Sequence, residues 1–306
     1  MLLRNARLTV PAILALVLLR LVIGWHFFME GTDKVKNGGF SSVGFLSSAK
    51  GPFAKKFQSM IPDFDGEIRL DESQMKSVYE GFVAQAGELY KFTEEQKSEA
   101  ESVTDKFRKK LKAIYRESKA AIDEYKNGTD RVAQLQNDPM RDKVAGMSRQ
   151  RDDIESKWRA LARPILSDID KITADFESEI NLLATDAQRG KDNLSASLKY
   201  PNAPPIDVKL IDKIIPIFDM SVGILLIVGL LTPIAGIAAG LFLASVVLTQ
   251  FPGSHGSVPT YYQAIEMAGC FFLAFADAGR YAGLDFLPWS FWNRNRKDLV
   301  KRPRDV

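Results

Sequence analysis

Apolar residues are concentrated in two parts of this chain of 306 residues. One apolar run fills residues 8–29, a long polar stretch follows, and apolar runs return at residues 214–231, 234–251 and 261–278. Each run is close to the ~20 residues that a helix needs to cross a bilayer. The pattern therefore predicts four transmembrane helices with a large polar insert after the first. The mean hydropathy of −0.11 averages the two parts and hides this division.

The first run is predicted to remain as a helix and not to be cleaved as a signal peptide. It carries Arg20 near its middle and ends in Met29-Glu30-Gly31, which offers no cleavage site of small residues. Lys and Arg are frequent in residues 294–306 and absent from the loop at residues 252–260. Because cytoplasmic loops are enriched in Lys and Arg, both termini are expected in the cytoplasm and residues 37–210 outside it.

Charge and cysteine content narrow the classes of partner. A net charge of +3 is too small for this length to indicate nucleic-acid binding. The basic residues 294–306 are interpreted as a cytoplasmic tail that sets orientation and contacts anionic lipid. Cys270 is the only cysteine, which excludes an intramolecular disulfide and a cysteine metal cluster, so any thiol chemistry would have to come from a partner.

Residues 37–70 mix Gly, Ser and Phe with lysines. This composition suits short amphipathic pieces at the outer membrane surface, and an ordinary aromatic-rich loop is the alternative. From Ser73 the pattern becomes helical, and residues 93–96 fit a capping box. Asn127-Gly128 is predicted to end the helix that follows. Its apolar positions recur at spacings of three and four, as expected for one helix face: Val103, Phe107, Leu111, Ile114, Ala121 and Tyr125.

Asp138-Pro139 is predicted to start a second long helix, because proline is tolerated at the first helical position. Pro164 should kink this helix. Two long seams predict an antiparallel helical hairpin or coiled coil in residues 71–200. This part contains no histidine or cysteine, so docking or spacing of a partner is expected there, not an active site. The second seam is Ile154, Trp158, Leu161, Ile165, Ile169, Ile172, Phe176, Ile180 and Leu183.

Ionisable residues inside the predicted spans are the main candidates for chemistry, because charge at membrane depth is costly. Arg20, Asp219 and Glu266 are expected to form a buried polar network, with the guanidinium holding both carboxylates. His26 and Glu30 lie one helical turn apart and are candidates for proton exchange. The network is interpreted either as structural or as a ligand or proton-relay site, and both interpretations stay open.

A metal site is not part of the favoured interpretation, although His26, His255 and a carboxylate form one conceivable set of ligands. The glycines of the spans have a structural interpretation. Gly223, Gly229 and the pair Gly236 and Gly240 are expected to allow close helix contact.

The spans resemble the DoxX family of bacterial membrane proteins. The resemblance covers somewhat over a third of the chain and leaves the insert outside it. It rests on three motifs: Arg20-x3-Gly24-x2-Phe27-x3-Gly31-x2-Lys34, Asp219-x3-Gly223-x5-Gly229-Leu-Leu-Thr232-Pro, and Asp277-Ala-Gly279-Arg280-Tyr281-Ala-Gly-Leu284-Asp285. In the last motif Ala278 stands where the family has its first Gly, and Ala-Gly stands near the usual Ser.

The resemblance implies an all-α protein of the bacterial inner membrane. It would form a four-transmembrane-helix bundle from residues 1–36 and 201–293. The extracytoplasmic helical hairpin between the first two spans is predicted from the seams of the insert and not from the resemblance. Some relatives are subunits of thiosulfate:quinone oxidoreductase, and others associate with redox enzymes of the envelope. The implied function is transfer of electrons from a sulfur compound or thiol to quinone, with no covalently bound cofactor.

Other functions stay open beside this one. A non-catalytic scaffold would use the helical insert to dock an extracytoplasmic partner, while the spans only anchor it in membrane lipid. A transporter would need homo-oligomerisation to form a path, and self-association is itself left open.

Overall fold

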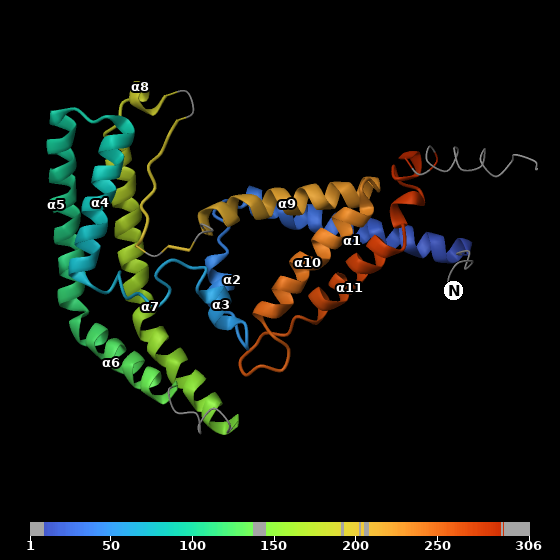
Figure 1. The fold of residues 1–306 in the computed structure, drawn as a ribbon, viewed down its shortest axis with the longest axis horizontal. Coiled ribbons are helices and arrows are strands. Elements are labelled where there is room, and N and C mark those ends of the chain that lie inside the picture. The colour runs from blue at the N-terminus through green and yellow to red at the C-terminus, as the bar shows by residue number, and fades with distance from the viewer. Residues whose placement is uncertain are drawn as a thin grey trace, which may run out of the picture. The chain divides into compact units, whose positions relative to one another are not determined.

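The computed structural model describes residues 9–136, 145–190, 193–201, 203–204, 208–288 and 290, with backbone only for 132–136 and 145–153. Throughout these ranges the regular elements are helices, so the fold is all-α as predicted. One isolated parallel bridge joins Lys50 and Gln250. The chain divides into two compact units, Met1–Ile61 with Pro205–Val306, and Pro62–Pro204 (Figure 1). Each is described by itself.

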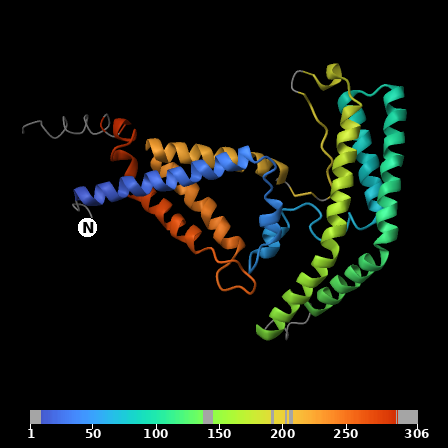
Figure 2. The ribbon, with the colours of Figure 1, turned by 180° about the vertical axis from the view of Figure 1, so that it is seen from behind.

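The first unit is a bundle of four longer helices. They are α1 (Val10–Lys36), α9 (Val208–Val228), α10 (Thr232–Thr249) and α11 (Tyr261–Phe275), followed by the 3-10 turn η1 (Ala278–Arg280). Helix α1 packs along α9 and α10 packs along α11, while contacts of α9 with α10 and of α1 with α11 complete the bundle (Figure 2). The short helices α2 (Val43–Ser47) and α3 (Ala54–Gln58) belong to the same unit.

Glycines allow these helices to approach closely, as the sequence predicts. A Cβ on Gly223 would stand 2.5 Å from the backbone nitrogen of Phe28, and one on Gly24 would stand 2.9 Å from that of Ile227. Where α10 packs along α11, a Cβ on Gly236 would lie 2.8 Å from the carbonyl oxygen of Cys270. No ordinary side chain fits at these positions, so the backbones pack directly against one another.

The helices of the first unit are apolar on the outside. Within the described part, α1 and α10 are long and apolar enough to cross a membrane. Of the other two predicted spans, α11 has 15 residues and α9 carries several charged residues. Large apolar side chains are nevertheless exposed on all four helices, including Leu14, Ile217, Leu241 and Ile265. Soluble monomers rarely expose large contiguous apolar patches, so this surface is expected to be covered by another apolar phase or partner.

The second unit has its own core. Its helices are α4 (Glu72–Tyr90), α5 (Glu94–Glu117), α6 (Lys119–Gln136), α7 (Ala145–Leu182) and α8 (Asp186–Arg189). Helix α7 packs against α4, α5 and α6. Both predicted seams face this core, but α4 packs into it as well, so the unit is more than a two-helix hairpin. Fully buried members of the core include Met75, Tyr79, Phe107, Ile169, Phe176 and Ile180.

Local signals in this unit are confirmed at one helix end and wrong at another. The capping box is present: the Thr93 Oγ1 accepts from the Gln96 backbone nitrogen at 3.3 Å, and the Gln96 Oε1 accepts from the Thr93 backbone nitrogen at 3.0 Å. The predicted stop at Gly128 is wrong, because the helix ends instead at Glu117, with Ser118 as its C-cap, and α6 continues through Gly128. A Cβ on Gly128 would collide with the ring of Trp158 on α7, so this glycine serves helix contact.

The start predicted at Asp138-Pro139 lies outside the described residues. Pro164 lies inside α7, and both views show that this helix bends along its length (Figures 1 and 2). A proline removes one backbone hydrogen bond and crowds the preceding turn, which accounts for the bend that the sequence predicts.

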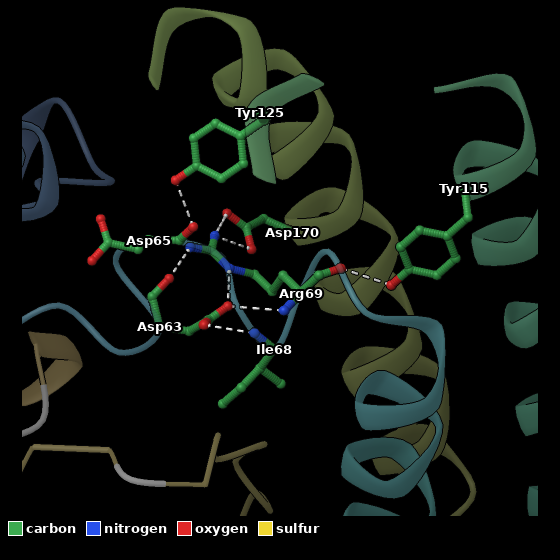
Figure 3. A network of polar contacts seen from close by, with 7 residues as sticks. All are labelled: Asp63, Asp65, Ile68, Arg69, Tyr115, Tyr125 and Asp170. Carbon is green, nitrogen blue, oxygen red and sulfur yellow. Dashed lines mark hydrogen bonds and ion pairs between the residues drawn. The ribbon is translucent and has the colours of Figure 1, made fainter. Parts of the chain in front are cut away.

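A partly buried ion-pair network ties the segment before α4 to α7 and α5 (Figure 3). Arg69 donates from Nη1 to both carboxylate oxygens of Asp170, at 2.9 and 2.7 Å, and from Nε to Asp63 at 3.1 Å. The Tyr115 hydroxyl donates to the Arg69 carbonyl at 2.7 Å. Burial raises the pKa of Tyr125, whose hydroxyl donates to a neighbouring carbonyl, to about 12. These closed pairings indicate a structural role.

Candidate functional site

A cavity of about 310 Å³ lies at one end of the first unit, between α1, α9, α10 and α11. Its walls are partly apolar, with Phe27 from α1 and Phe242, Leu243 and Val246 from α10. Residues 40–45, which lead into α2, close one side. Its remaining lining residues are mostly ionisable or polar: His26, Glu30, Lys34, Ser42, Asp219, Tyr262, Gln263 and Glu266.

The segment that closes the cavity is fixed to two helices. The backbone nitrogen of Ser42 donates to the carboxylate of Asp212 on α9 at 2.7 Å. Farther along, the backbone nitrogen of Lys50 donates to the Thr249 carbonyl at the end of α10, at 2.6 Å. Gln250 also donates from Nε2 to the Ser48 carbonyl at 2.9 Å. The amphipathic residues predicted to lie at a membrane surface thus cover this end of the bundle.

Five ionisable side chains form a continuous polar chain along the cavity. Glu266 Oε1 lies 2.7 Å from His26 Nδ1, and His26 Nε2 lies 3.8 Å from Glu30 Oε1. The other oxygen of Glu30 lies 3.3 Å from Lys34 Nζ, which donates to Asp219 Oδ2 at 2.7 Å. The chain connects α11 through α1 to α9. Neighbouring groups at or near hydrogen-bond distance can exchange protons, so this polar chain fits a proton relay.

Charge in the polar chain is not balanced. Three carboxylates face one lysine and one histidine, so the formal charge stays negative even with the histidine protonated. Asp219 is the most deeply buried member, with its side chain 1% exposed. Its Oδ1 has no hydrogen-bond partner among the described residues, and the same holds for Gln263 Oε1 and Ser42 Oγ. Buried polar atoms without partners are rare and usually mark a site for a ligand, water or ion.

Arg20 lies elsewhere, which corrects the predicted network of Arg20, Asp219 and Glu266. Arg20 is 1% exposed, and its guanidinium donates to three backbone carbonyls, those of Ala278 at 3.0 Å, Tyr281 at 3.1 Å and Ala282 at 2.9 Å. The prediction fails because α1 is displaced along the bundle. Arg20 lies level with Gly229, just beyond the end of α9, and residues 10–19 extend past that point (Figures 1 and 2).

The Arg20 end of the bundle has the features of a structural junction. A Cβ on Gly229 or on Gly283 would stand 2.5 Å from Arg20 Nη1, so glycine is needed at both positions. Asp285 accepts from the backbone nitrogens of Leu231 at 2.6 Å and Thr232 at 2.9 Å, which caps the start of α10. The third sequence motif therefore joins the ends of α9, α10 and α11.

The structure brings the other predicted site residues together. His26 and Glu30 lie in the polar chain with Glu266, and Asp219 joins them through Lys34. Sequence reasoning placed Lys34 on the correct helix face but gave it no role. It also missed Ser42 and Gln263, which carry no pattern of their own. Within the described residues, no group of three His, Cys, Asp or Glu side chains is arranged to hold a metal ion.

Comparison of the chain with models of known protein families, with curated proteins and with solved structures finds no match. The function proposed below is argued from the geometry of the cavity and from the sequence motifs.

Proposed function

We propose that this chain is a DoxX-like subunit of a redox complex in a bacterial inner membrane, where it binds quinone and passes it electrons from a sulfur compound or thiol. The observation that carries this proposal is the cavity beside the polar chain. It combines apolar walls with a relay of ionisable groups inside a bundle that is apolar outside. A quinone needs this combination, because its ring is apolar and its reduction takes up protons.

The size and chemistry of the cavity fit a quinone head group. A cavity of ~150 Å³ holds benzene, so the volume of about 310 Å³ accommodates a substituted ring. Phe27 and Phe242 offer ring faces for packing against it. Lys34 uses two of its three ammonium hydrogens in the polar chain, which leaves one for a quinone carbonyl. The residues present therefore suit a quinone without any further cofactor in this chain.

His26 and Glu30 are proposed to exchange protons with the outside. Their side chains are 44% and 54% exposed, against 12% for Glu266 and 1% for Asp219. The polar chain thus runs from accessible groups to a buried one. Two thiols that join as a disulfide release two electrons and two protons, and one quinone takes up the same number. A partner enzyme would hold the thiols or sulfur compound and supply the electron-transfer group.

The proposed topology is that of four spans, α1, α9, α10 and α11, with both termini in the cytoplasm. All four helices carry exposed apolar side chains and pack into one bundle. In this topology the cavity opens toward the outer side, where residues 37–210 lie. A reporter active only outside the cytoplasm should then work when fused near Gln150 and fail when fused after Val306.

A scaffold function is the second candidate, and the second unit favours it. Pro62–Pro204 forms a compact unit with its own buried core, so it has the properties of a separate docking domain. The two candidates differ in what the cavity does. A scaffold needs no ligand there, whereas a redox subunit loses turnover when the cavity is filled.

The decisive experiment is to purify the full chain in mild detergent, extract it with organic solvent and measure quinone per chain. Val246→Phe should fill the cavity and reduce the bound quinone at least fivefold. Leu241→Phe is the matched control, because Leu241 points outward from α10 and is 60% exposed. Absence of quinone from the wild-type chain, both as purified and after addition of quinone, would exclude the redox proposal and leave the scaffold.

A further inference from the structure

The buried acceptor atoms of the cavity distinguish the two redox states of a quinone. Asp219 and Gln263 line the cavity, and their side-chain oxygens Oδ1 and Oε1 are buried and lack hydrogen-bond partners among the described residues. Among the donors of the polar chain, Lys34 is bound to Asp219 and Glu30, which leaves one ammonium hydrogen, and His26 Nδ1 is bound to Glu266. Within the described residues, the cavity therefore combines two buried acceptors that lack a donor with the donors of Lys34 and Tyr262. It is complementary to a ligand that donates hydrogen bonds.

We infer that the cavity binds the reduced quinol more tightly than the oxidised quinone, with Asp219 Oδ1 accepting a hydrogen bond from one quinol hydroxyl. This inference rests on the proposed function and goes beyond it by specifying which redox state the site prefers. The Ser42 hydroxyl can serve either state, because it both donates and accepts.

The preference follows from what each state leaves unpaired. A quinone has two carbonyl acceptors and no donor, so a quinone that displaces water from the cavity leaves Asp219 Oδ1 without any partner. A quinol restores that hydrogen bond with one of its hydroxyls. The bond is to a carboxylate that also accepts from Lys34 at 2.7 Å. Hydrogen bonds to charged acceptors are about twice as strong as neutral ones, and losing one buried bond weakens binding roughly tenfold or more.

Tighter binding of quinol favours electron transfer into the site. The bound quinone takes up two electrons from the sulfur donor and two protons through the polar chain, and both carbonyl oxygens become hydroxyls. Because the site stabilises the product of this step, it shifts the equilibrium of the bound pair toward quinol. Electron transfer in this direction is what the proposed function requires, because there the donor is oxidised on the outer side and quinone accepts the electrons.

The test is equilibrium binding of decylubiquinol and decylubiquinone to the full chain in lipid nanodiscs, measured without oxygen. The wild-type chain should bind the quinol about tenfold tighter than the quinone. Asp219→Asn should reduce this ratio to about threefold or less, because an amide in place of the carboxylate is a weaker acceptor. Gln263→Met removes the other acceptor at similar volume and should lower quinol affinity with little change for quinone. Asp285→Asn, at the opposite end of the bundle, is the matched carboxylate control and should keep the wild-type ratio.

The outcomes separate this inference from the proposed function. Equal binding of both states, or tighter binding of the quinone, would overturn the inference and leave a quinone site. Failure of both probes to bind the wild-type chain would overturn both. If Asp219→Asn does not fold, the ratio in Gln263→Met decides, and an unchanged ratio there would contradict the role of the buried acceptors.

Discussion

Arg20→Met removes the guanidinium that joins α1 to the loop after α11 and should destabilise the first unit. Methionine has a similar length and no donor, so the carbonyls of Ala278, Tyr281 and Ala282 lose bonds of 3.0, 3.1 and 2.9 Å. The bond to Ala278 is fully buried, and leaving such a group unpaired costs about 1–3 kcal/mol. The other two are partly buried and add less, which gives a total of about 2–5 kcal/mol.

The assay can use the chain's only thiol. Cys270 is 0% exposed, so a thiol-reactive dye labels it only when the bundle opens, and its reaction during heating in detergent reports unfolding. The expected loss lowers the melting temperature by about 4–20 °C, given ~2–4 °C per kcal/mol for a unit of this size. The melting temperature of Arg20→Lys should lie between those of Arg20→Met and wild type, because an ammonium keeps the charge but not the planar fork of donors.

Two comparisons make the result specific. Arg280→Met is the matched control: Arg280 is partly exposed, lies 3.8 Å from Asp277 and donates to the Tyr281 hydroxyl at 3.0 Å, so its loss should cost less than that of the buried Arg20. Arg20→Met combined with Asp219→Asn should be additive within ~0.5 kcal/mol, because the two residues share no contact. An Arg20→Met chain that melts within 2 °C of wild type would refute the junction argument. Strong coupling to Asp219 would restore the single network that the sequence suggests.

Three further predictions concern stability. The second unit expressed alone should be soluble and melt cooperatively, with Phe176→Ala costing about 3–5 kcal/mol in chemical unfolding and the exposed Leu182→Ala costing little. Hydrogen bonds from Ser73 hold the pKa of Asp71 below its ordinary value. The free energy of unfolding of wild type should therefore exceed that of Asp71→Asn at pH 7, and this difference should vanish as pH falls through the lowered pKa. A difference that is the same at pH 7 and below that pKa would contradict the prediction. In the first unit, Gly223→Ala should lower the melting temperature clearly, whereas Gly81→Ala in α4 of the second unit, with open space at its Cβ, should be neutral or stabilising.

Local and periodic signals in the sequence predicted the helices well. The seam residues Phe107, Leu111, Ile169 and Phe176 are buried because a spacing of three or four positions puts side chains on one helix face. Gly128 shows the limit of such signals. A glycine near the end of a seam is also what a close helix crossing requires, and only the packing of α7 decides between the two uses.

The candidate site was predictable in some of its members but not in its pairings. Depth along the predicted spans suggested that Arg20 meets Asp219, because both fall in the outer half of their spans. That estimate assumes that all spans begin at one level, whereas residues 10–19 of α1 extend past the end of α9. Ten residues of helix are ~15 Å, enough to move Arg20 from the carboxylates to the opposite end of the bundle. Such an offset depends on how Gly24 and Gly31 fit against α9, and no periodicity encodes it.

The offset also determines the chemistry of the cavity. With Arg20 bound to carbonyls, the partner of Asp219 is Lys34, near the far end of α1, and the same ammonium also holds Glu30. One lysine then serves two carboxylates, and within the described residues the ion-pair partner of Glu266 is His26. A guanidinium at this place would have satisfied both oxygens of Asp219 and closed the network as a structural element. Because an ammonium reaches only Oδ2, one buried oxygen remains unpaired, and that atom is the reason to look for a hydrogen-bond donor as the ligand.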